Sequence, residues 1–155
     1  MGIRSRIFFI ILSCLFIGIS LAFVVAERDL SEGLQEQIEN ELSKQAKILR
    51  QSFSHHPLNF SPNTLKSEID NYSQSSGARI TIIAINGEVL VDSELDNQDL
   101  KALDNHANRP EVAAALTNGM GSSKRFSNTT QQEMLYFALL DRTSGEGRII
   151  RISVP

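Results

Sequence analysis

The sequence contains a single cysteine, Cys14, and that cysteine lies inside an apolar run near the N-terminus. The rest of the chain therefore forms no disulfide and has no thiol chemistry. The sequence also has no nucleophile elbow, no phosphate-binding P-loop and no HExxH metal motif. We expect a chain that is not an enzyme by itself, that carries no cofactor, and whose fold depends on its hydrophobic core alone.

Charged residues are missing from residues 7–26, IFFIILSCLFIGISLAFVVA. At ~1.5 Å per residue, a helix of this length crosses a hydrocarbon layer of ~30 Å. Arg4 and Arg6 precede the run, whereas acidic residues follow it. Because positive charge favours the cytoplasmic side, we expect residues 1–6 in the cytoplasm and residues 27–155 outside the cell membrane.

A removable signal peptide is the alternative to a transmembrane helix. Val24 and Ala26 form a small-residue site that a signal peptidase could accept. The apolar part of a signal peptide is ~7–15 residues long, however, and this run is longer. The length therefore favours a retained membrane anchor.

The expected external part is acidic. Without Arg4 and Arg6, 13 basic residues remain against 18 acidic ones, which gives a net charge of −5. Nucleic-acid-binding domains are usually basic, so this balance argues against a nucleic-acid partner.

Apolar residues recur every three or four positions after the apolar run, which predicts one long helix over residues 28–54. These positions are Leu30, Leu34, Ile38, Leu42, Ala46, Leu49 and Phe53. The stripe has two explanations, packing against the domain's own sheet and pairing with a second copy, and we expect both at different heights along the helix. The spacing does not keep a strict heptad, so a long coiled coil is not indicated.

The period changes from helix to strand at Arg79, after a second short helix over residues 63–74. The expected strands cover residues 79–85, 88–92, 122–127, 133–140 and 148–154, with a short helix over 109–118. Asn86-Gly87 predicts a type I′ hairpin turn, which needs positive φ at both positions. The fold class is therefore α+β, with one five-stranded antiparallel sheet over residues 63–155 and helices on one face.

Three segments carry a resemblance to a known family. They are ITIIAINGEVLVDSE (80–94), NHANRPEVAAALTNGMGSSKRFS (105–127) and EMLYFAL (133–139). Together they resemble the extracytoplasmic PAS-like domain of sensor histidine kinases, and most closely the phosphate-regulon type.

The resemblance implies a signal-input domain that senses outside the membrane and passes a conformational change to a cytoplasmic kinase, and through it to a response regulator. We expect a second transmembrane helix after Ser153-Val154-Pro155, with the kinase in a part that this chain does not contain. The chain is then the N-terminal fragment of a dimeric receptor.

Basic and hydroxyl side chains provide the candidate ligand contacts. They are His106, Arg109, Ser122, Lys124, Arg125, Ser127 and Tyr136. The planar fork of arginine suits a carboxylate or a phosphate, and in this kind of sensor a pocket lies beside the short helix that crosses the sheet. The competing interpretation is structural: Arg109 pairs with an acidic neighbour, and His106 holds its loop through a backbone hydrogen bond.

Two other groups are weaker candidates for a metal site. The acidic residues Asp92, Glu94, Asp96 and Asp99 lack the glycine and the distal glutamate of a calcium loop, so a solvated turn is favoured. His55-His56 has no evident further ligands. We therefore expect no metal.

Two other functions remain open. A pilin also joins an apolar N-terminal helix to an antiparallel sheet, but residues 7–26 lack the glutamate that pilins carry. An input domain of a chemotaxis transducer or a cyclase is a further alternative. The stimulus, whether a ligand or an envelope partner, is not identified by the sequence.

Overall fold

The computed structural model describes residues 2–54, 62–100, 102–127, 130–143 and 147–155. The chain divides into two compact units, Met1–Ile38 and Glu39–Pro155. His55-His56, one of the two weak candidates for a metal site, lies outside the described residues.

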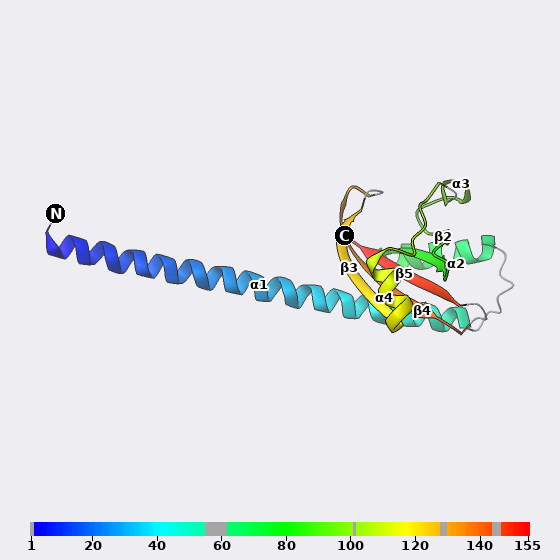
Figure 1. The fold of residues 1–155 in the computed structure, drawn as a ribbon, viewed down its shortest axis with the longest axis horizontal. Coiled ribbons are helices and arrows are strands. Elements are labelled where there is room, and N and C mark those ends of the chain that lie inside the picture. The colour runs from blue at the N-terminus through cyan, green and yellow to red at the C-terminus, as the bar shows by residue number, and fades with distance from the viewer. Residues whose placement is uncertain (1, 55–61, 101, 128–129, 144–146) are drawn as a thin grey trace. The chain divides into compact units, whose positions relative to one another are not determined.

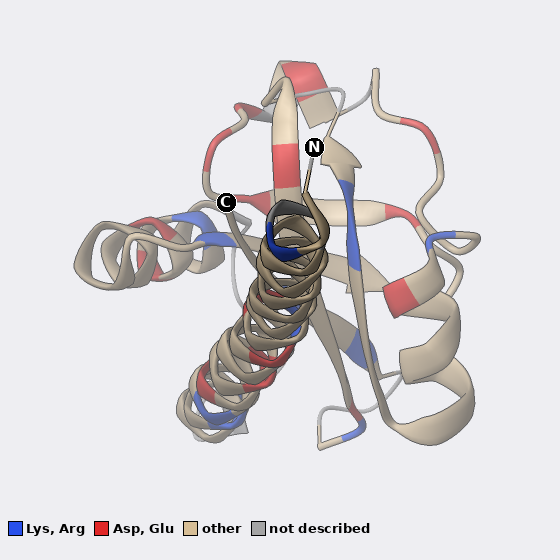
Figure 2. Ribbon diagram, turned by 90° about the vertical axis from the view of Figure 1, so that its left-hand side faces the viewer, with Lys and Arg blue, Asp and Glu red and all other residues tan. Residues whose placement is uncertain are grey.

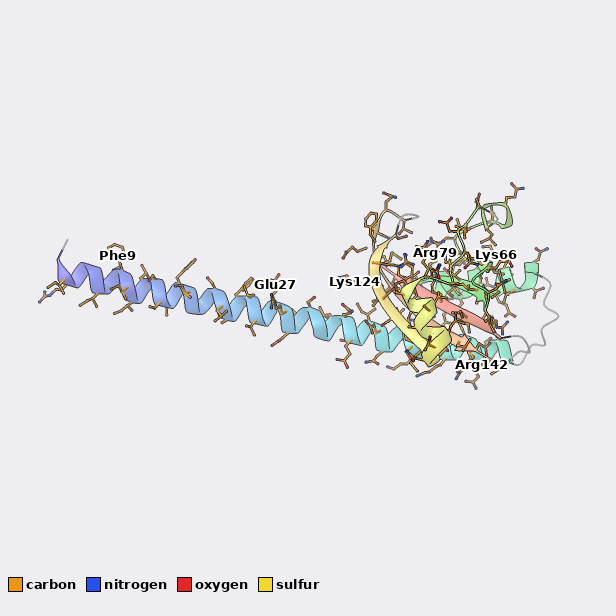
Figure 3. All side chains as sticks on the ribbon, in the orientation of Figure 1. Phe9, Glu27, Lys66, Arg79, Lys124 and Arg142 are labelled. Carbon is orange, nitrogen blue, oxygen red and sulfur yellow. The ribbon has the colours of Figure 1, made fainter. Side chains whose placement is uncertain are left out.

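Helix α1 extends from Ile3 to Ser54 without a break, as the sequence predicts for residues 28–54. In its N-terminal part every described side chain of residues 7–26 is exposed, and Phe9 and Glu27 mark this part in Figure 3. In the part of the chain that the structure describes, α1 is the one helix long and apolar enough for a membrane span or a signal sequence.

The second unit contains one antiparallel sheet with the strand order β2-β1-β5-β4-β3 (Figure 1). The strands are β1 (Arg79–Ala84), β2 (Val89–Asp92), β3 (Met120–Ser127), β4 (Gln132–Asp141) and β5 (Arg148–Val154). The five expected strands are therefore present. The order places the last strand of the chain at the centre of the sheet, between β1 and β4.

The hairpin between β1 and β2 forms as expected, but its turn is not type I′. Gly87 has φ 87°, whereas Asn86 is not among the described residues with positive φ. The Gly87 N–H donates to the Ala84 carbonyl (2.8 Å), and the Ala84 N–H donates to the Glu88 carbonyl (2.8 Å). This is a three-residue loop that ends in a left-handed glycine, and only that last position requires glycine.

One face of the sheet is covered by the end of α1 and by α2 (Pro62–Ser76). Four residues of α1 are buried there with two of α2, against apolar side chains of β1, β4 and β5. They are Leu42, Ala46, Leu49 and Phe53 of α1, and Leu65 and Ile69 of α2. This part of the predicted stripe therefore packs on the domain's own sheet.

The opposite face is covered by α4 (Pro110–Asn118), so the expectation of helices on one face only is wrong (Figure 2). Val112 and Ala115 of α4 are fully buried with Ile149 of β5. Ile149 alternates along β5 with Ile150, which faces the other core. Because successive side chains of a strand point to opposite faces, a strand that is apolar throughout needs cover on both. The short helix α3 (Asn97–Leu100) adds Leu100 to this second face.

Candidate functional site

The loop before α4 holds two of the predicted contact residues at the sheet. The His106 N–H donates to the Gly87 carbonyl (2.8 Å), and the His106 Nδ1 lies 2.7 Å from the Asp104 carbonyl. The Arg109 N–H donates to the His106 carbonyl (3.0 Å). Arg109 is then the extended N-cap residue of α4, with Pro110 in the first turn. The expected backbone hydrogen bond of His106 is therefore confirmed.

This loop and the α4 face of the sheet enclose a cavity of about 200 Å³. Four of the residues that line it are arginines, and each comes from a different strand or loop. The lining residues are Arg79, Ala102, Leu103, Asp104, His106, Arg109, Arg125, Phe126, Ser127, Tyr136 and Arg151. Figure 3 marks Arg79 within the dense group of side chains at the sheet.

A fully buried carboxylate, Glu111 of α4, lies beside the cavity. It accepts hydrogen bonds from the Ser123 Oγ (2.6 Å) and the Arg125 Nη2 (3.0 Å), and the Arg151 Nη1 lies 3.5 Å from its Oε1. Burial raises the pKa of Glu111, but the hydrogen bonds from Arg125 and Ser123 outweigh it and hold that pKa below its usual value. Glu111 is therefore the ionised internal partner of Arg125 and Arg151.

A second buried carboxylate, Asp92 of β2, balances Arg79. The Arg79 Nε lies 3.0 Å from the Asp92 Oδ1, and the Thr81 Oγ1 donates to the Asp92 Oδ2 (2.7 Å). Arg79 also pairs with Glu94 through Nη1 (3.1 Å). Two residues of the predicted acidic cluster are thus used in ion pairs with Arg79. Among the described residues, no group of three or more histidines, cysteines and carboxylates is placed to hold a metal ion.

Two guanidinium groups at the cavity keep a free donor. The Nε atoms of Arg109 and Arg151 are buried and have no hydrogen-bond partner among the described residues. Arg151 donates to the Thr81 Oγ1 through Nη2 (3.1 Å), whereas Arg109 takes part in no ion pair within the described part of the chain. The expectation that Arg109 pairs with an acidic neighbour is therefore not met there.

The Tyr136 ring stacks against two of the arginines that line the cavity. The Arg125 guanidinium lies 3.9 Å from the centroid of the Tyr136 ring, and that of Arg151 lies 5.2 Å from it. Such stacking orients arginine while leaving its N–H groups free to donate in the plane.

The positive charge around the cavity also acts on His106. Burial lowers the pKa of the His106 imidazole, and the charges of Arg151, Arg109 and Arg125 lower it further, against the hydrogen bond to the Asp104 carbonyl. His106 is therefore held neutral to a lower pH than a free histidine.

Two predicted contact residues do not line the cavity. Ser122 and Lys124 alternate with Ser123 and Arg125 along β3, so their side chains point to the other side of the strand. The Ser122 Oγ donates to the Glu39 Oε2 (2.9 Å), and the exposed Lys124 Nζ lies 3.6 Å from the Glu133 Oε2.

The sequence analysis missed three charged residues of the site, Arg79, Glu111 and Arg151. A signal for Arg151 was present, because it interrupts the apolar strand RIIRISV with isoleucines on both sides. A charge in a strand that is apolar on both faces has to be buried, and a buried charge requires a partner.

Comparisons with known proteins identified no relative of this chain. Neither the models of protein families nor the curated protein sequences that were searched match this chain.

Proposed function

We propose that this chain is the membrane-anchored, extracytoplasmic signal-input domain of a sensor histidine kinase. One observation carries the proposal. Helix α1 has no charged residue over residues 7–26, and its C-terminal end packs in the core of the sheet domain. The packed residues are Leu42, Ala46, Leu49 and Phe53. A single helix is thus both the candidate anchor and a structural part of the folded domain.

The charge pattern supports the orientation of this anchor. Arg4 precedes the apolar run, and Glu27 and Asp29 follow it, and this charge difference favours a sheet domain outside the cytoplasm. A retained helix also supports sensing, because a change in the sheet domain alters the end of an element that enters the membrane. A cleaved signal peptide would leave no such connection.

The kinase output is supported by the resemblance in residues 80–94, 105–127 and 133–139 alone. The five-stranded antiparallel sheet, crossed on one face by the short helix α4, is compatible with the PAS-like domain that this resemblance implies. In this proposal a kinase outside the present chain phosphorylates a response regulator.

Pairing of two copies is part of the proposal. Leu30, Leu34 and Ile38 continue the apolar stripe of α1 but are exposed, unlike the positions from Leu42 onward. An exposed apolar stripe next to a membrane anchor suits contact with the same stripe of a second copy.

The proposal is tested with reporters fused after Pro155. Alkaline phosphatase, which is active only outside the cytoplasm, should be active and should remain in the membrane fraction, whereas green fluorescent protein should not fluoresce after general secretion. As a matched control, moving the charges of Arg4 and Arg6 to the other end of the run should reduce phosphatase activity. Release of a shortened, soluble fusion would contradict the retained anchor.

A further inference from the structure

The arginine-lined cavity has more hydrogen-bond donors than the described residues satisfy. Arg79 is balanced by Asp92 and Glu94, and Arg125 is balanced by Glu111. Arg151 shares Glu111 with Arg125 at the longer distance of 3.5 Å.

Among the four arginines that line the cavity, Arg109 is the one without a carboxylate partner in the described part of the chain. A buried N–H without an acceptor costs about 1–3 kcal/mol, and more when the group is charged. The Nε atoms of Arg109 and Arg151 are both in this state, and both residues line the same cavity. Arg151 is only 4% exposed, so bulk water does not readily compensate its free donor.

The size of the cavity restricts what can accept these hydrogen bonds. At ~30 Å³ per water molecule, about 200 Å³ holds about six waters. A phosphate ion or a carboxylate with a short carbon chain fits a space of this size.

We propose that this cavity binds a small oxyanion, a carboxylate or a phosphate, through Arg109 and Arg151. Two oxygens of such an ion match the planar fork of a guanidinium, and Arg125, stacked on Tyr136, closes the site. Asp104 is an exposed carboxylate at the rim, and its negative charge disfavours ligands with a large negative charge. The role of this ion as the signal rests on the proposed function, whereas its binding does not.

The pKa of His106 provides a second measurement of binding. It should change with added anion only if the arginines form a binding site, and not if they are purely structural. Its imidazole faces Arg151 of β5, Arg109 before α4 and Arg125 of β3, and its Nδ1 contacts the Asp104 carbonyl. An anion among these arginines offsets their charge, so the pKa of His106 rises when the site is filled.

The test uses the full chain in detergent micelles, titrated by calorimetry with inorganic phosphate and, separately, with succinate at constant ionic strength. We expect one probe to bind more tightly than about 1 mM. In Arg109→Gln the affinity for that probe should fall about tenfold to a hundredfold, as for the loss of a charged hydrogen bond. This variant should fold normally, because Arg109 makes no ion pair with any described residue.

Lys124→Gln is the matched control, because it removes the same charge from β3 outside the cavity and should bind the probe like the wild type. At a probe concentration that just saturates the wild type, nuclear magnetic resonance should show a higher His106 pKa than without probe in the wild type, and a much smaller rise in Arg109→Gln. The proposal is overturned if neither probe binds, or if Arg109→Gln binds as the wild type does. If the phosphatase fusion is active but neither phosphate nor succinate binds, the oxyanion site is overturned while the proposed receptor function stands.

Discussion

Replacing Glu111 by glutamine tests whether this one carboxylate stabilises the fold as the shared counter-ion of Arg125 on β3 and Arg151 on β5. Glu111 is fully buried and interacts with Arg125 and Arg151, which are themselves largely buried. Glutamine keeps the shape and one acceptor oxygen but removes the charge, so Arg151 is left in the protein interior without its counter-ion.

The structure sets the size of the expected effect. Breaking a buried ion pair by removing one partner costs roughly 3–5 kcal/mol, because the other charge stays buried. A typical domain is stable by about 5–15 kcal/mol, so Glu111→Gln removes a large fraction of the total. Glu133→Gln is the matched control. Glu133 of β4 pairs with Lys124 of β3 in solvent, where such a pair is worth about 0–1 kcal/mol.

Urea unfolding of the full chain in detergent, followed by circular dichroism, measures both variants. The midpoint of Glu111→Gln should fall strongly with an unchanged slope, whereas that of Glu133→Gln should stay close to the wild type. Equal midpoints for the two variants would refute the view that Glu111 is the counter-ion of the arginine cluster.

Three further predictions concern pH, the hairpin and α1. Burial and the nearby arginines lower the pKa of His106 in the folded state, so the unfolded chain takes up the proton first and stability falls as the pH drops below about 6.5. His106→Gln should flatten this fall in urea midpoints measured across that range, and an unchanged slope would contradict the lowered pKa of His106. Gly87→Ala should destabilise the domain by more than about 1 kcal/mol, because φ is 87° and the new Cβ would collide with Ala107, whereas Gly77→Ala meets no neighbour and should lose less in the same assay. Single cysteines from Leu30 to Leu42, in a Cys14→Ser background, should cross-link between copies with a helical period, and a flat pattern would contradict pairing through α1.

Local patterns were enough to predict the elements. The charge-free run and the apolar stripe after it predict the uninterrupted helix α1, because helical periodicity and hydrophobicity are properties of neighbouring residues. Pro110 and Gly119 predict both ends of α4, since each acts through its own backbone geometry. The basic residues His106, Arg109 and Arg125 were also identified from the sequence as one group.

Only the tertiary structure decided which face of the sheet each residue serves. The order β2-β1-β5-β4-β3 pairs strands that are distant in the sequence, and this pairing brings Arg79 and Arg151 to the same cavity as Arg125. An apolar strand indicates that both faces are covered, but which helix covers which face depends on where α1, α2 and α4 pack, and the pattern of a strand does not encode that. Lys124 and Arg125 are neighbours in the sequence, yet strand alternation sends one to solvent and the other to Glu111. Their different roles follow from long-range register, because a charge becomes a structural or binding group only where the fold removes it from water.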